Sequence, residues 1–177
     1  MPALVPVLLV SLVLMVLFPS DSFGARPFKM ACVSDEGYGE YSAVLQELVG
    51  DVPEVREFGD YPCVDGNISR EVGEWLPDAV VLLLGANDSK SCNWKGKEEF
   101  LDRYLTMVDE LRRLPTHPRI FLCIPPGPSS DCDEISDSII FHGVKPVIES
   151  LRGRRWLDVV DCYSLFEGRS ELLAEDG

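Results

Sequence analysis

The sequence predicts one domain of the α/β class, a three-layer α/β/α sandwich around a central parallel sheet. Short runs rich in Val, Ile and Leu alternate along the chain with segments whose apolar residues recur at helical spacing. The short runs are apolar throughout rather than at every second residue, which is typical of parallel strands buried on both faces. Right-handed crossovers between such strands place helices on both sides of the sheet.

Five short runs are expected to form the strands. The clearest is 79–84 (AVVLLL), which is followed directly by Gly85, and the run IFLCI ends at the proline-rich segment 125–128. The expected strands are 28–33, 55–58, 79–84, 120–124 and 157–160. Ligands of parallel sheets bind beyond the carboxyl ends of the strands, so the segments that follow these runs are where a functional site is expected.

Four segments between the strands are expected to be amphipathic helices. The residues Tyr41, Val44, Leu45 and Leu48 recur at i, i+3, i+4 and i+7 and predict a helix over 41–49. The other three helical faces are marked by Ile68, Val72 and Trp75, by Phe100, Tyr104, Met107, Val108 and Leu111, and by Pro146, Val147, Ile148 and Leu151.

The charge of the chain excludes some classes of partner. The 177 residues include 30 acidic and 16 basic side chains, which gives a formal net charge of −14. Nucleic acids and anionic membranes attract basic surfaces, so neither is expected as a partner of the folded domain. A hydrophobic content of 46% and a charged content of 26% are ordinary for a globular protein.

The first 24 residues are expected to be a signal peptide, which leaves residues 25–177 as the folded domain. The apolar run from Ala3 to Phe18 is shorter than the roughly 20 residues of a membrane-spanning helix. The small residues that a signal peptidase accepts follow it, between Ser22 and Ala25. We therefore expect a secreted monomer, and the alternative is a protein anchored in the membrane by an uncleaved N-terminal segment.

The cysteine pattern argues against a metal centre. Six cysteines are present, at positions 32, 63, 92, 123, 132 and 162. None of them forms a C-x-x-C pair, so neither a zinc site nor a thioredoxin-like redox centre is expected. In an oxidising compartment some of them should form disulfides, but six cysteines allow 15 connectivities and the sequence does not choose among these. Cys32 and Cys123 lie in apolar runs, and buried free thiols are the alternative there.

The segment 85–89 (GANDS) directly follows the clearest strand. An asparagine at this place can point its side-chain amide into a crevice and donate to an oxyanion, and the alternative for Asn87 is a simple Asx turn. Asn87 also begins a glycosylation sequon, but a tight turn at a strand end is poorly accessible. A second sequon, at 67–69 (NIS), lies on an expected surface segment, so Asn67 is the predicted glycan site.

The stretch 77–94 (PDAVVLLLGANDSKSCNW) resembles the third conserved block of the SGNH hydrolases, also called GDSL esterases or lipases. It is most similar to the branch whose block reads L-G-x-N-D-S-K followed by N-W. Weaker similarity extends over 28–177. The resemblance implies a flavodoxin-like α/β/α fold, hydrolysis of acyl esters of carbohydrates or lipids, and no cofactor. It also implies a Ser nucleophile after the first strand, a His base with an Asp two residues before it, and an oxyanion site.

The resemblance assigns these roles residue by residue. Asn87, with Gly85 beside it, matches the oxyanion position of the third block, and Asp176 matches the acid of the triad. The first block, G-D-S in the family, corresponds to 34–36 (SDE), so Glu36 occupies the position of the nucleophile. A different alignment makes Ser34 the nucleophile but breaks the phase of the strand.

Other positions depart from the family pattern. Pro62 falls on the oxyanion glycine of the second block and has no N–H to donate, while Gly59 is expected at a backbone turn. The histidine that should follow Asp176 by two residues lies beyond Gly177, and we expect a diverged member shortened at its carboxyl end and lacking the last helix of the family. His117 and His142 are expected to be surface residues that do not replace the base.

Two functions therefore remain open. The first is an ester hydrolase impaired by the missing Ser and His. The second is a pseudoenzyme that binds a glycan or an acylated ligand, with Asn93 and Trp94 supplying a hydrogen bond and a stacking surface; packing under the loop is the alternative for Trp94. A third interpretation, a flavodoxin-like domain unrelated to esterases, is disfavoured because 37–40 (GYGE) lacks the third glycine of a phosphate-binding G-x-G-x-x-G turn.

Overall fold

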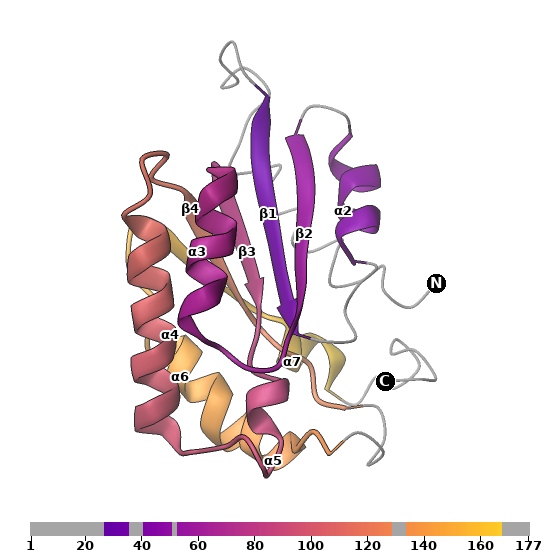
Figure 1. The fold of residues 1–177 in the computed structure, drawn as a ribbon. Helices are drawn as coiled ribbons and strands as arrows, with labels where there is room; N and C mark the ends of the chain where they lie inside the picture. The colour runs from indigo at the N-terminus through magenta and orange to yellow at the C-terminus, as the bar shows by residue number, and fades with distance from the viewer. Residues whose placement is uncertain (1–26, 36–40, 51–52, 129–133, 168–177) are drawn as a thin grey trace.

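The structure, a computed structural model, describes residues 27–35, 41–50, 53–128 and 134–167. These residues form a single five-stranded sheet with the strand order β2-β1-β3-β4-β5, and every neighbouring pair is parallel (Figure 1). The strands are β1 (Phe28–Asp35), β2 (Pro53–Tyr61), β3 (Ala79–Leu83), β4 (Arg119–Ile124) and β5 (Leu157–Asp161). The predicted α/β fold with a central parallel sheet is confirmed.

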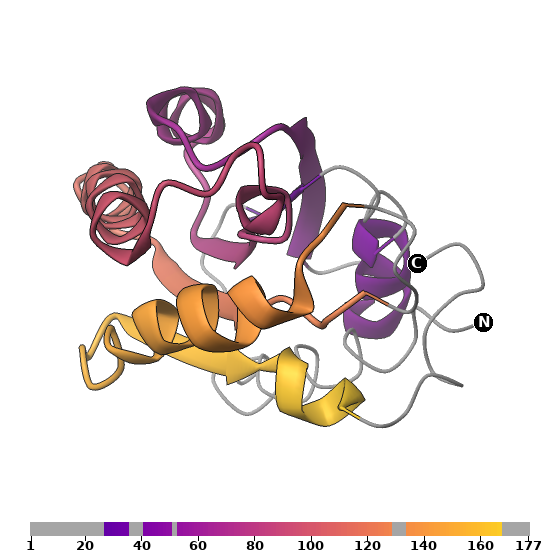
Figure 2. The same cartoon turned by 90° about the horizontal axis from the view of Figure 1, so that it is seen from below.

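Helices connect the strands and cover the sheet. They are α2 (Tyr41–Val49), α3 (Gly66–Trp75), α4 (Lys97–Arg112), α5 (Asp137–Ile139), α6 (Lys145–Glu149) and α7 (Cys162–Phe166). A 3₁₀ turn, η2 (Asn87–Ser89), follows β3, and a π-helical turn, η3 (Ile140–Val144), joins α5 to α6. Figure 2 shows the segment α5–η3–α6 from below, running across the end of the molecule towards which the strands of Figure 1 point.

Alternate residues of each strand enter two different cores. On β3, Val80 and Leu82 pack in one core with α3, α4 and α6, while Val81 and Leu83 pack in the other with Leu45 of α2. Both sets are buried, which explains why the central strands are apolar at every position. The apolar stripe predicted for α4 is the face that it buries against the sheet.

The largest error in the predicted strands concerns β2. The run 55–58 is only the middle of a nine-residue strand, Pro53–Tyr61. β2 is an outer strand of the sheet, and Glu54 and Arg56 are exposed on it, so its apolar pattern is interrupted. Gly59 lies inside this strand, and its φ is not positive, so the expectation that it sits at a backbone turn is wrong. The turns η2 and η3 and the helix α7 were not predicted.

The described cysteines are not disulfide-bonded. Cys32, Cys123 and Cys162 are buried, Cys63 is half-buried and Cys92 is exposed. The sixth cysteine, Cys132, and the predicted signal peptide at 1–24 lie outside the described residues. Within the described part of the chain, no helix is long and apolar enough to cross a membrane.

Candidate functional site

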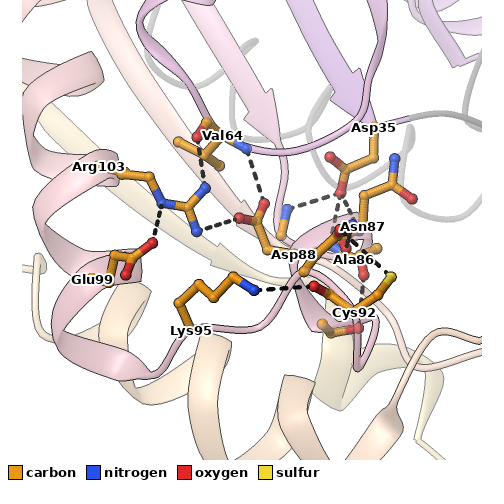
Figure 3. Close-up of polar contacts among 12 residues, drawn as sticks. Asp35, Val64, Ala86, Asn87, Asp88, Cys92, Lys95, Glu99 and Arg103 are labelled. Carbon is orange, nitrogen blue, oxygen red and sulfur yellow. Dashed lines mark hydrogen bonds and ion pairs between the residues drawn. The ribbon is translucent and has the colours of Figure 1, made fainter.

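Asp35, the last residue of β1, ties the end of that strand to the turn after β3. Its Oδ2 atom accepts hydrogen bonds from the backbone N–H groups of Gly85 (2.8 Å), Ala86 (2.7 Å) and Asn87 (3.1 Å), as Figure 3 shows. The side chain is 1% exposed. The two strand ends therefore meet at the carboxyl edge of the sheet, the edge at which the parallel strands end and at which a ligand site is expected.

Burial and hydrogen bonding shift the pKa of Asp35 in opposite directions. Burial disfavours the charged carboxylate and raises the pKa of Asp35 to about 7, while the three backbone N–H groups and the nearby negative charge of Asp88 act as smaller influences. Within the described part of the chain, the Oδ1 atom of Asp35 has no hydrogen-bond partner. This carboxyl group is therefore a candidate for protonation near neutral pH.

Asn87 lies where the ends of β1, β2 and β3 come together. Its Nδ2 atom donates a hydrogen bond to the backbone carbonyl of Tyr61 at the end of β2 (2.9 Å), and the residue is 3% exposed. The turn is closed by the backbone, because the N–H of Ser89 donates to the carbonyls of Gly85 and Ala86. An Asx turn is thus not what Asn87 provides. A side-chain amide has two hydrogens, and the bond to Tyr61 uses one of them.

The side chains packed around Gly85 leave no room for a side chain at this position. Its φ is +119°, a conformation that side chains disfavour, and a Cβ atom there would lie 2.8 Å from Cγ1 of Val144 and 3.3 Å from the ring of Phe100. Its N–H is one of the three that Asp35 accepts. The residue therefore fixes the turn through its backbone.

Asp88 holds the loop between β2 and α3 against α4. Its carboxylate accepts the N–H of Val64 (3.0 Å) and forms an ion pair with Arg103 (3.0 Å), whose Nη1 donates to the carbonyl of Val64 (2.9 Å) (Figure 3). Burial raises the pKa of Asp88, although the N–H of Val64 and the charge of Arg103 oppose this. The loop that follows β2 is thereby fixed beside Asn87.

The two residues predicted to bind ligand, Asn93 and Trp94, are half-buried and make contacts that support the loop. Nδ2 of Asn93 donates to the backbone carbonyl of Asn87 (2.8 Å). The ring of Trp94 is half-buried, packs against Phe100 with 5.8 Å between ring centroids, and abuts Gly143, where a Cβ atom would lie 2.7 Å away. This is the packing role that the sequence left as the alternative for Trp94. Their part in ligand binding stays a prediction.

Apart from the histidines, the remaining residues to which the sequence assigned or denied a catalytic role are Glu36, Asp176, Ser34 and Pro62. Glu36 and Asp176 lie outside the described residues. Ser34 is fully buried, and a Cβ atom on Gly59 of β2 would lie 3.6 Å from its Oγ atom. The pairing of β1 with β2 is irregular between Val33 and Asp35, which is where Ser34 lies. Pro62 is exposed directly after β2.

Both histidines are exposed, as predicted. His117 has a φ of +48° and precedes β4, at the end of the sheet away from the site. His142 is on η3, where its ring stands edge-on to Phe141 at 4.8 Å between centroids. Among the described residues no group of three or more His, Cys, Asp or Glu side chains is placed to hold a metal ion.

Comparisons with known proteins find esterases and a lipase among the proteins that this chain resembles. No family model matches the chain. The chain is 25% identical over 186 residues to an acetylxylan esterase of Xylanibacter ruminicola, with 84% of this chain covered. It spans only 39% of the length of that relative.

Solved structures share the fold. The lipase/acylhydrolase from Enterococcus faecalis superposes with a TM-score of 0.66 at 22% identity and covers 85% of each chain. A carbohydrate esterase family 3 protein from Talaromyces cellulolyticus has a TM-score of 0.54 at 17% identity, with 85% of this chain and 86% of that chain covered. These matches show that the chain shares the fold of these enzymes and is similar in sequence to an acetylxylan esterase, which agrees with the resemblance of 77–94 to the SGNH hydrolases.

Proposed function

We propose that this domain binds acyl esters of carbohydrates at the carboxyl edge of its sheet and hydrolyses them slowly. The observation that carries the proposal is the position of Asn87, whose side-chain amide lies where β1, β2 and β3 end. An N–H held there can donate to the oxygen of an ester carbonyl as negative charge develops on it. The relatives named for acetylxylan and carbohydrate ester hydrolysis support carbohydrate esters as the substrate class.

The low rate follows from the residues around Asn87. The sequence has Glu36 immediately after Asp35, where the family has its serine. Attack by a carboxylate on an ester would give an anhydride rather than the usual acyl-enzyme ester. Pro62 supplies no backbone N–H to the oxyanion site.

A non-catalytic binding protein is the second candidate. Glu36 and Pro62 favour it, because both depart from the family at positions that serve bond cleavage, while Asn87 is retained. In this case the retained asparagine holds the carbonyl oxygen of an acylated sugar without turnover. The two candidates share one binding mode and differ only in whether the ester bond breaks.

The experiment compares the purified protein with Asn87→Ala, using 4-nitrophenyl acetate for turnover and acetylated xylo-oligosaccharides for binding by calorimetry. We expect hydrolysis slightly above the buffer rate, and we expect Asn87→Ala to abolish the excess and weaken binding of the acetylated sugar. Removing one oxyanion donor typically costs about 10²–10³-fold in kcat. Binding that depends on Asn87 without any turnover would favour the non-catalytic candidate.

Ser89→Ala is the matched control, since it removes the hydrogen bond from the Ser89 hydroxyl to the Ala86 carbonyl in the same turn but leaves the Asn87 side chain in place. Equal losses in the two variants would mean that loop stability, and not the Asn87 amide, is responsible. The proposal is wrong if the protein neither binds acetylated sugars nor hydrolyses the ester in an Asn87-dependent way.

We also propose that the protein is a secreted, monomeric glycoprotein, with Asn67 carrying the glycan. The apolar segment at 3–18 supports secretion. Asn67 is exposed in the first turn of α3, where its backbone N–H is capped by Asp65. The sequon at Asn87 is a poor acceptor by comparison, because that residue is 3% exposed.

A further inference from the structure

Phe141 is an exposed aromatic residue at the carboxyl edge of the sheet. Two large apolar side chains are exposed among the described residues, Phe141 at 40% and Leu76 at 42%. Leu76 is the C-cap of α3, just before β3 begins, and so lies at the opposite edge. Phe141 is on η3, which is pressed onto the turn after β3 by the contact between Val144 and Gly85.

The ring of Phe141 packs against neighbouring rings while 40% of the residue stays exposed. It packs on Tyr163 at 5.6 Å and on His142 at 4.8 Å between ring centroids. Tyr163 is itself fixed, because its hydroxyl donates to Oδ1 of Asp137 (2.8 Å). Gly127, in the loop after β4, leaves room for this pair, since a Cβ atom there would collide with Asp137. The exposed ring is therefore rigidly placed.

Polar groups surround this ring. The Nζ atom of Lys145 lies 6.0 Å from the centroid of the Phe141 ring and is held by Asp161 (2.8 Å) and by the Oγ atom of Ser164 (2.7 Å). Although burial acts in the other direction, the hydrogen bonds from Lys145 and Ser164 lower the pKa of Asp161, so the Asp161 carboxylate stays charged. The exposed imidazole of His142 completes the rim.

We propose that Phe141, supported by Tyr163 and flanked by His142 and Lys145, is a subsite for a sugar ring of the carbohydrate ester bound at Asn87. The inference rests on the proposed function and extends it to the sugar. An aromatic face packs on the C–H face of a sugar, and fixed polar groups beside it bind the hydroxyls. A single ring within a polar rim is too small an apolar surface for a stable protein interface.

The spacing of the sheet fits this assignment. Asn87 follows β3, while Tyr163 and Ser164 follow β5, two strands further along the sheet. Neighbouring strands lie about 4.8 Å apart, so the two places are separated by about 10 Å along the edge. A short oligosaccharide with its acyl group at Asn87 spans that distance and reaches Phe141.

The test measures binding of unesterified and of acetylated xylohexaose to the full chain by calorimetry, for the unaltered protein, Phe141→Ala, Phe141→Trp and Asn87→Ala. We expect Phe141→Ala to weaken both sugars roughly tenfold and Phe141→Trp to retain affinity. Asn87→Ala should affect the acetylated sugar alone. Leu76→Ala, which removes the other exposed apolar side chain, is the control and should change nothing.

The subsite is refuted if Phe141→Ala binds both sugars as tightly as Leu76→Ala does. Acetyl-dependent binding that is lost in Asn87→Ala would then still support the proposed function. If the unaltered protein binds neither sugar, the subsite is refuted as well, and Asn87-dependent turnover of 4-nitrophenyl acetate decides separately whether the ester site exists. Thermal melts of the variants exclude unfolding as the cause.

Discussion

Asp35 joins two strand ends through a single carboxylate oxygen. Three consecutive backbone N–H groups converge on Oδ2, and the other oxygen is buried without a described partner. Replacing this residue by an apolar one would leave three N–H groups of the turn unsatisfied, at a cost of about 1–3 kcal/mol for each buried group. The position of Asn87 therefore depends on Asp35.

Asp35→Asn is predicted to change how stability depends on pH. The pKa of Asp35 is about 7 in the folded protein and 3.8 for a free side chain, so between these values the unfolded chain is ionised while the folded chain holds the proton. Stability from this group is complete below pH 4 and is lost as the pH rises to about 7, by an amount on the order of a few kcal/mol. Asparagine does not titrate, so the variant should lack this loss.

Urea unfolding of both proteins from pH 4 to pH 8 tests the prediction, with the exposed Asp102→Asn as control. The free energy of unfolding of Asp35→Asn, relative to the unaltered protein, should rise across this range, and that of Asp102→Asn should stay level. Parallel curves for the unaltered protein and Asp35→Asn would contradict the assigned pKa.

At the scale of elements, the segment α5–η3–α6 is held over the carboxyl edge by close contacts to small residues. The ring of Trp94 lies against Gly143, and Val144 lies against Gly85. The backbone of Ser136 also donates to the hydroxyl of Ser89 (3.2 Å). A π-helical turn at this place brings three segments into contact that are distant in sequence, and it presents Phe141 outward.

Gly143→Ala is predicted to destabilise the fold by about 1–3 kcal/mol, because the added methyl group would overlap the Trp94 ring at 2.7 Å. Chemical denaturation measures the loss, and the tryptophan emission should shift if the ring moves. Gly66→Ala, in the first turn of α3, is the control because nothing lies within 4 Å of an added Cβ. Equal stability of the two variants would show that the segment moves freely.

The elements that could be predicted from the sequence are those whose burial is uniform. Strands β3 and β4 are buried on both faces, so their runs are apolar at every position. Strand β2 was predicted too short because an outer strand exposes charged residues such as Arg56. The π-helical turn could not be foreseen, since it depends on the contact between Trp94 and Gly143, which belong to different segments.

The candidate site could be predicted only in part for the same reason. Asn87 stands in a recognisable motif directly after the clearest strand, and the structure places it beside the end of β1. No structural role was predicted for Asp35, which the sequence marks only as the middle residue of the segment 34–36 that differs from the family's first block. Its role depends on the strand pairing that brings it next to residues 85–87. The pairing of Asp88 with Arg103 joins a turn to the middle of α4, and no local pattern signals it.

For the molecule as a whole, the reactivity of the cysteine thiols is a measure of how well the core excludes solvent. Cys32, Cys123 and Cys162 share the core on the α2 side of the sheet. The hydrogen bond between the thiols of Cys123 and Cys162, together with burial, raises the pKa of Cys123 well above its usual range. Low thiolate content and burial both make a thiol unreactive.

We predict that, among the described cysteines, alkylation of the folded, reduced protein modifies the exposed Cys92 first and the half-buried Cys63 more slowly, since burial raises the pKa of Cys63. The three core thiols should react only after unfolding in denaturant. Peptide mass mapping over time distinguishes these classes. Labelling of Cys123 as fast as that of Cys92, or a disulfide at Cys123 in the purified protein, would contradict this packing.

The strand order also bears on self-association. The two outermost strands of the described sheet, β2 and β5, are the edges to which a strand of another chain could add. Both edge strands carry charged side chains: Glu54 and Arg56 on β2, and Asp158, which pairs with Arg119, on β5. A polymer growing from either border would have to bury these groups out of water. The charges on the two edge strands therefore disfavour fibrous aggregation by edge-to-edge strand pairing.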